Sequence, residues 1–234
     1  MKLRRAALGA VALAICAAGT LYYHQVDKAV TAEDAAYIPR YVAAGPHLEK
    51  AGYEAQIRFI EQAQRAVLNA APRQKGLPYR QPREPKQLLE AGNGACYDRS
   101  RAIEKILTHH GFETRHVFLL STEATGSALK SLLKPGVSSH AVTEVRTEKG
   151  WVVVDSNSAW MSIAKDGRPV AMREIQRGGV GRFANQPAEP IFFGPFTFVY
   201  GLYSRHGYFY APYNPIPDVN YRELLYNLTD RGGP

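Results

Sequence analysis

The chain has 234 residues, of which 45% are hydrophobic and 21% charged, and this composition suits one packed domain with a short additional segment. The formal net charge is +8, and three of the positive charges, Lys2, Arg4 and Arg5, lie at the N-terminal end. No block of Lys and Arg alternates with aromatic residues, so we expect no binding to nucleic acid.

Residues 1–23 have the pattern of a membrane anchor or a signal peptide. Residues 6–23 contain no charged side chain and are about as long as a helix that spans a bilayer. The positive residues before them predict that this end stays in the cytoplasm and that the rest is exported. We expect a retained anchor that leaves the domain facing the periplasm or the cell exterior. Secretion after cleavage near Ala17-Ala18-Gly19 is the alternative.

The pattern predicts a linker over 24–45 and one domain over 46–234. Apolar residues recur at helical spacing over 48–68 and predict a helix that Pro72 follows. Residues 72–85 are rich in Pro, Arg and Gln without periodicity, which indicates a loop. A short helix over 85–91 then leads to a Gly92-Asn93-Gly94 turn.

The next predicted helix covers 96–110 and ends before Gly111, because glycine commonly follows the last turn of a helix. A buried strand is predicted over 115–120. Residues 121–138 form a polar excursion with a short helix at 128–133.

A β-hairpin is predicted over 140–155, with its turn at Lys149-Gly150. Side chains alternate between the two faces of a strand, so a turn with an even number of residues places His140 and Asp155 on the same face. They would then be opposite or diagonal neighbours within hydrogen-bonding reach.

The remainder is irregular over 156–190 and rich in aromatic residues over 191–221. We interpret the aromatic part as core and as a loop that packs over the hairpin, with a surface that stacks on sugars or another substrate as the alternative. The aromatic residues are Phe192, Phe193, Phe196, Phe198, Tyr200, Tyr203, Tyr208, Phe209, Tyr210, Tyr213 and Tyr221.

Cys96 is the best candidate for chemistry, because the other cysteine, Cys16, lies inside the N-terminal segment. Cys96 begins a predicted helix, where unpaired N–H groups and the helix dipole stabilise a thiolate. His140 is the candidate base, and Asp155 would orient its imidazole. His109 and His110 are adjacent on a helix and point in different directions, so we expect no metal site and no cofactor.

The oxyanion of an attacked carbonyl needs hydrogen-bond donors. The backbone N–H of Cys96 is one candidate, and the side-chain amides of Gln87 and Asn93 are alternatives for the second. Asp98 and Arg99 are interpreted as a capping residue and a surface residue.

Four motifs in this order resemble the transglutaminase-like core of the papain-like cysteine enzymes. They are Gly94-Ala95-Cys96-Tyr97-Asp98, Gly111-Phe112-Glu113-Thr114-Arg115, His140-Ala141-Val142-Thr143-Glu144-Val145 and Gly150-Trp151-Val152-Val153-Val154-Asp155. The resemblance covers about residues 85–160. It implies an α+β fold, with N-terminal helices packed on an antiparallel sheet and the nucleophile at a helix N-terminus. It also implies a triad of Cys96, His140 and Asp155. The family commonly has an aromatic residue after His-Ala and a proline after the aspartate, where this chain has Val142 and Ser156.

The resemblance implies an exported enzyme that forms a thioester with an acyl group. Peptidase, amidase and transglutaminase activities all remain open, because bacterial members of this type are often thought of as proteases or amidases. The expected substrate is a peptide, a protein or an envelope polymer that bears an amide. The alternative is a non-catalytic module that binds an envelope polymer or a protein and carries a vestigial triad.

Overall fold

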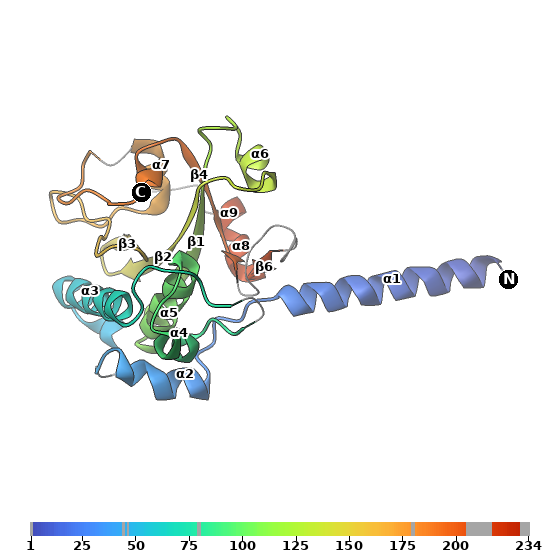
Figure 1. Cartoon of the computed structure of the whole chain (residues 1–234), viewed down its shortest axis with the longest axis horizontal. Helices are drawn as coiled ribbons and strands as arrows, with labels where there is room; N and C mark the ends of the chain where they lie inside the picture. Colours follow the sequence, from blue (N-terminus) through green and yellow to red (C-terminus); the bar gives the residue numbers. More distant parts are fainter. Residues whose placement is uncertain are drawn as a thin grey trace.

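The computed structural model describes residues 2–43, 45, 47–78, 81–178, 181–204 and 217–229, and for residues 2–8 only the backbone. The chain folds into helices around an antiparallel sheet (Figure 1). The elements are α1 (Lys2–His24), α2 (Ala32–Tyr37), η1 (Ile38–Arg40), η2 (Leu48–Lys50), α3 (Tyr53–Ala70), α4 (Pro85–Ala91), α5 (Cys96–His109), β1 (Thr114–Ser121), α6 (Ala128–Leu133), β2 (Ser139–Thr147), β3 (Gly150–Val154), α7 (Met172–Gly178), η3 (Pro190–Phe192), β4 (Phe196–Tyr200), β5 (Leu202–Tyr203), β6 (Asp218–Val219), α8 (Tyr221–Leu224) and α9 (Tyr226–Thr229).

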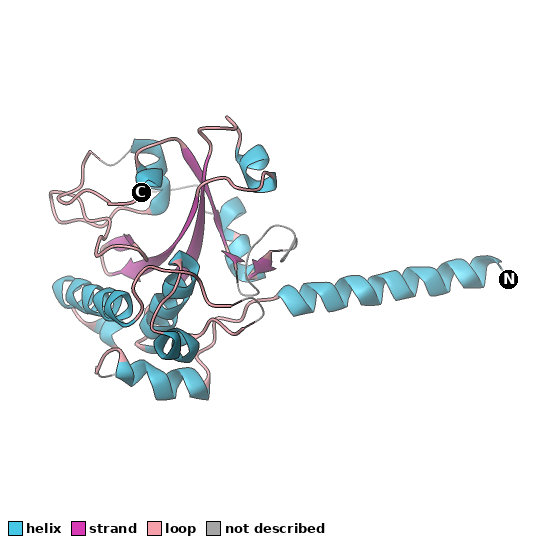
Figure 2. Ribbon diagram, viewed as in Figure 1, coloured by secondary structure: helices cyan, strands magenta, loops and turns pink. Residues whose placement is uncertain are grey.

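The main sheet has four strands in the order β3-β2-β1-β4, and every neighbouring pair is antiparallel (Figure 2). The hairpin β2–β3 pairs Thr147 with Gly150, so its turn has two residues. Gly150 has φ +129°, which favours glycine at this position. The predicted hairpin and the α+β class are both confirmed, but the turn lies at Glu148-Lys149, one residue before the predicted Lys149-Gly150, because Gly150 already pairs in β3. The predicted strand at 115–120 is also present, as β1.

Helices α3, α4 and α5 form a layer on one side of the sheet (Figure 2). Apolar side chains of α3 and α5 pack against β2 and β3, and this burial is the main stabilising contribution of the layer. These buried residues include Ile60, Ala63, Val67, Ile103, Ile106, Leu107, Val145, Val152 and Val154. The predicted start of the first domain helix at residue 48 is wrong. The short helix η2 is separated from α3 by Ala51 and Gly52, which both have extended backbone.

A second apolar cluster covers the other side of the sheet. Its buried members include Val117, Leu119, Val142, Val153, Trp160, Met172, Phe183, Phe192, Phe198 and Tyr200. Much of the aromatic part therefore serves as core, as interpreted from the sequence. Residues 156–190, interpreted only as irregular, also contribute to this core and contain the helix α7. The sequence did not predict β4, which pairs with β1. Tyr208, Phe209, Tyr210 and Tyr213 lie outside the described residues.

The segment predicted as a linker packs into the domain. Val26, Ile38 and Val42 are at most 3% exposed, and the last two belong to the core between α3 and α5. Helix α1 extends away from the domain (Figure 1), but its C-terminal end is held, since His24 Nδ1 lies 3.0 Å from Asp218 Oδ1. No helix among the described residues has the length and the apolar character needed to cross a membrane.

Candidate active site

Helix α5 begins at Cys96, and the loop before it is held by Asp98. The carboxylate of Asp98 accepts hydrogen bonds from the backbone N–H groups of Ala95, at 2.9 Å, and Leu77, at 3.0 Å. It also forms a buried ion pair with Arg83. A carboxylate in the first turn satisfies N–H groups that a helix leaves unpaired, so Asp98 fixes the place where α5 starts.

Gly94, in the turn before Cys96, lies close to α4. A Cβ atom there would lie 2.6 Å from Leu88 Cδ1, so the buried Leu88 side chain would have to shift.

Cys96 is a partly exposed residue at the start of α5. Its thiol interacts with the His140 side chain and with the backbone N–H of Ala141, and both interactions favour the thiolate. Burial alone would raise the pKa of Cys96. The hydrogen bond and the charge of His140 outweigh burial, so the pKa of Cys96 is lowered.

His140 and Asp155 meet at the open end of the hairpin. The register pairs Thr143 with Val154, which makes His140 and Asp155 diagonal neighbours on one face. Asp155 Oδ1 lies 2.7 Å from His140 Nε2, which leaves Nδ1 as the ring nitrogen available to the thiol. Both side chains are at most 2% exposed.

The environment of this pair favours its ionised form. Burial alone would lower the pKa of His140, but hydrogen bonds to Asp155 and Cys96 raise that pKa to about 10. Burial alone would raise the pKa of Asp155, whereas the His140 contact and hydrogen bonds from Ser158 and Asn157 lower it. These shifts favour a thiolate–imidazolium pair next to the Asp155 carboxylate.

The amides predicted for the oxyanion do not touch this group within the described part of the chain. Asn93 Nδ2 donates to Ala91 O at 2.9 Å, and Gln87 Oε1 is buried without a hydrogen-bond partner among the described residues. Their role in binding an oxyanion stays a prediction. The amide that does approach is Asn157, whose Nδ2 lies 3.5 Å from His140 Nδ1. Its place two residues after Asp155 was the signal that could have identified it.

Gln64 of α3 supports the segment after Asp155. Its Nε2 lies 2.7 to 3.0 Å from the carbonyl oxygens of Asp155, Ser158 and Trp160. Gln64 is fully buried. Its position, as a polar residue on the buried face of the helix predicted over 48–68, is the feature of the sequence that could have identified Gln64.

Two residues depart from the common family pattern, and both are accommodated. Ser156 is buried, and its hydroxyl donates to Ala141 O at 2.5 Å, which joins the ends of the two hairpin strands. Val142 is fully buried in the cluster on the far side of the sheet. The interpretation of Arg99 as a surface residue is wrong, because its side chain is fully buried beneath the site.

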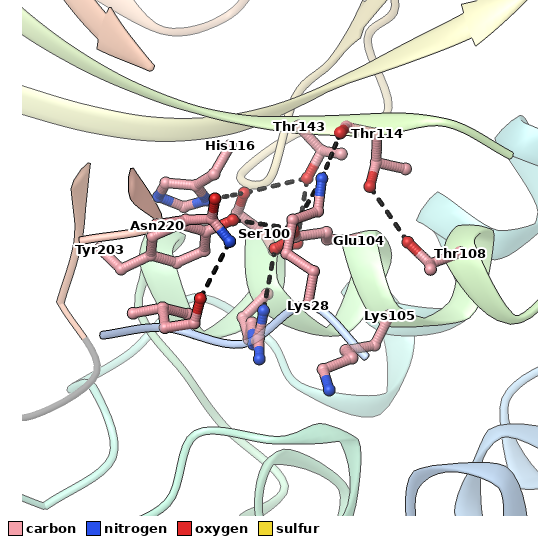
Figure 3. Close-up of polar contacts among 12 residues, drawn as sticks. Lys28, Ser100, Glu104, Lys105, Thr108, Thr114, His116, Thr143, Tyr203 and Asn220 are labelled. Atoms are coloured by element: carbon pink, nitrogen blue, oxygen red, sulfur yellow. Dashed lines mark hydrogen bonds and ion pairs between the residues drawn. The ribbon is translucent and has the colours of Figure 1, made fainter. Parts of the chain in front are cut away.

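A second group of ionisable side chains lies on the other flank of α5 and is called the Tyr203 cluster. It comprises Lys28, Glu104, His116, Tyr203 and Glu223, and Figure 3 shows its labelled members between α5 and the strands. The Tyr203 hydroxyl lies 2.8 Å from both Glu104 Oε1 and Glu223 Oε2. Within the described part of the chain, no three His, Cys, Asp or Glu side chains are placed to hold a metal ion.

These observations define an α+β domain of the papain-like class, with a thiol at a helix N-terminus against a His–Asp pair on a hairpin. The family model of the transglutaminase-like superfamily matches residues 48–156, which include Cys96, His140 and Asp155. The matched region, residues 48–156, therefore belongs to the transglutaminase-like superfamily. No curated protein matches the chain.

Proposed function

We propose that this protein is an exported, membrane-anchored cysteine enzyme that transfers acyl groups from amides. The observation that carries the proposal is the His140–Asp155 pair, joined at 2.7 Å, which interacts with the Cys96 thiol at the start of α5. The transglutaminase-like superfamily generally includes cysteine-dependent acyltransferases and peptidases, which supports the same class of chemistry.

The reaction is a consequence of the ionised pair. The Cys96 thiolate attacks the amide carbonyl carbon, a C–S bond forms, and the carbonyl electrons move to oxygen. The backbone N–H of Cys96 is a donor available to that oxyanion, as at other helix starts. Protonated His140 gives its proton to the amide nitrogen, the C–N bond breaks, and an amine leaves behind a thioester.

The second half of the reaction regenerates the thiol. Neutral His140 takes a proton from water or from an acceptor amine, which attacks the thioester carbonyl. The C–S bond breaks, the thiolate leaves, and the product is an acid or a new amide. Asp155 keeps the imidazole oriented and stabilises its charged form in both halves. Hydrolysis and transfer differ only in this acceptor.

The anchor is proposed on the charge pattern of the N-terminal segment. Three positive residues precede a stretch without charge, and that pattern favours export of the chain beyond the stretch. The substrate would then be a peptide, a protein or an envelope polymer that bears an amide.

The test uses a deletion strain of the source organism, complemented at matched protein levels. We expect Cys96→Ser and His140→Ala to fail to complement, and the double variant to be no worse, because triad members act as a unit. Asp155→Asn is expected to lose no more than either of these variants. Equal complementation by wild type and Cys96→Ser would show that the thiol is dispensable. The non-catalytic binding module would then take precedence.

A further inference from the structure

Arg99 is buried beneath the candidate site, where neutral oxygens surround its charge. It lies one turn after Cys96 in α5 and is fully buried. Within the described part of the chain its guanidinium donates to neutral oxygens alone, namely Ser156 O and Gly94 O at 2.5 Å, Ala71 O at 3.3 Å, and Asn157 Oδ1. No carboxylate among the described residues forms an ion pair with it. The other arginines buried near it do form such pairs: Arg83 with Asp98, and Arg101 with Glu84 and Glu104.

The four acceptors come from the three segments that build the site. Gly94 belongs to the turn before the nucleophile helix, and Ala71 ends α3. Ser156 and Asn157 directly follow Asp155. A planar guanidinium presents its donors in fixed directions, so one side chain sets the distances between these segments.

Asn157 contacts both Arg99 and the His140–Asp155 pair. Its Oδ1 accepts from Arg99, while its Nδ2 lies 3.5 Å from His140 Nδ1 and its backbone N–H donates to Asp155 Oδ1 at 3.0 Å. The Arg99 contact turns the Asn157 amide nitrogen toward His140, because only the oxygen can accept from a guanidinium. That nitrogen can donate to Nδ1 only while the imidazole is neutral, so in the imidazolium form the Asn157 side chain acts on the site through its bond to Arg99.

The charge of Arg99 acts on the thiol as well. Burying a cation is unfavourable unless a nearby negative charge compensates it. Burial lowers the pKa of Arg99, and the negative charges that oppose this are those of Cys96, Asp98 and Asp155. The same interaction contributes to the lowered pKa of Cys96, after the effects of burial, His140 and Ala141.

We propose that Arg99 is a positioning residue of the site, one that joins the nucleophile helix to the segment after Asp155 and favours the thiolate form of Cys96. This role rests on the proposed thiol chemistry. A merely structural Arg99 would contribute to folding but would leave the ionisation of the thiol unchanged in any variant that folds.

The experiment measures the rate at which iodoacetamide alkylates Cys96 across pH 5 to 9 in the full-length protein. Peptide mass spectrometry separates Cys96 from Cys16. The variants are Arg99→Gln, which removes the charge and most donors, and Asn157→Ala, which removes the link to His140. Arg101→Gln is the matched control, since Arg101 is also buried in α5 but pairs with Glu84 and Glu104.

We expect Arg99→Gln to move the midpoint of alkylation upward by about one pH unit, so that the rate below the midpoint falls about tenfold. Asn157→Ala should lower the rate by less, and Arg101→Gln should leave the profile at its wild-type position. A folded Arg99→Gln protein with the wild-type profile would overturn the proposal.

Circular dichroism shows whether Arg99→Gln folds. If it does not fold, the Asn157→Ala variant tests the proposal, and an alkylation profile of this variant identical to that of wild type would overturn it. A wild-type protein whose Cys96 reacts only at the pH of an ordinary thiol is a different failure. It would contradict the proposed function itself.

Discussion

Gln64 is the residue that most directly holds the backbone after Asp155. Its amide nitrogen has two hydrogens and lies within hydrogen-bonding distance of three carbonyl oxygens, so the donors are shared. Because Gln64 belongs to α3, this contact couples the first helix of the layer to the position of the Asp155 carboxylate.

We expect Gln64→Ala to lower the free energy of unfolding by about 2 kcal/mol, because buried carbonyl groups lose their donor. Urea unfolding followed by circular dichroism measures the change. Gln62→Ala is the matched control in the same helix, since Gln62 is exposed and should change stability by less than about 0.5 kcal/mol. A Gln64→Ala protein as stable as the control would mean that the segment finds other donors.

At the residue level, the sequence predicted the meeting of His140 and Asp155 because strand alternation and a two-residue turn determine which side chains share a face. It did not predict the setting of Arg99. A charged residue beside a helix cap is expected to be exposed when the segments that pack on it are unknown. Three of the four acceptors of Arg99 are backbone carbonyl oxygens, which no side-chain pattern reveals. The distant acceptors Ala71, Ser156 and Asn157 are brought together only by the fold.

At the scale of elements, local patterns predicted α4, α5, α6 and the hairpin, because helical spacing, Pro and Gly boundaries and strand alternation are properties of short segments. Strand β4 was missed for the opposite reason. Its aromatic residues were interpreted as general core, and the property that makes it a strand is pairing with β1, more than seventy residues earlier. The bonds that join the end of α1 to β6 are equally non-local.

The Tyr203 cluster joins three elements through one hydroxyl. That hydroxyl has a single hydrogen for two carboxylates, so a proton on Glu223 would give the second contact its own donor. Burial, with a further contribution from Glu104, raises the pKa of Glu223 to about 7 despite the nearby Lys28. The cluster therefore links α8, β5 and α5 in a manner that depends on pH.

The raised pKa determines the sign of this dependence. Between the ordinary glutamate value of 4.5 and about 7, the folded protein holds the proton of Glu223 and the unfolded chain releases it. The contribution of Glu223 to stability is thus complete below about pH 4.5 and is lost as the pH rises through about 7. Glu223→Gln cannot ionise, so this loss should be absent from the variant.

We expect the free energy of unfolding in urea to fall for wild type between pH 5 and pH 8. Relative to wild type, the Glu223→Gln variant should be more stable at pH 8 than at pH 5 by about 1 to 3 kcal/mol. Glu123→Gln, at an exposed position, serves as the control and should keep the wild-type dependence. If the free energy of unfolding changes equally with pH in wild type and in Glu223→Gln, then Lys28 keeps Glu223 ionised in the folded protein.

At the scale of the whole molecule, the segment that follows α1 meets the C-terminal part of the described chain where α1 joins the domain. Tyr221 Oη donates to Leu21 O at 3.0 Å, and Val26 N donates to Val219 O at 2.9 Å. Residues 9–22 of α1 are exposed on every side, whereas His24 and Val26 are buried. The exposed part of α1 therefore ends, and the domain begins, at about residue 23.

The proposed export of the domain leads to a test of orientation. The charges of Lys2, Arg4 and Arg5 favour retention of that end in the cytoplasm, so a reporter fused after Pro234 should be active only outside it. We expect a phosphatase that requires export to be active in this fusion and a fluorescent protein that requires the cytoplasm to be dark. Replacing the three positive residues with glutamate is the control and should reduce the phosphatase signal, because the orienting charge is lost while the apolar stretch is kept. Activity of the cytoplasmic reporter alone would contradict export, and the acyl-transfer proposal would then need a cytoplasmic substrate for the same thiol.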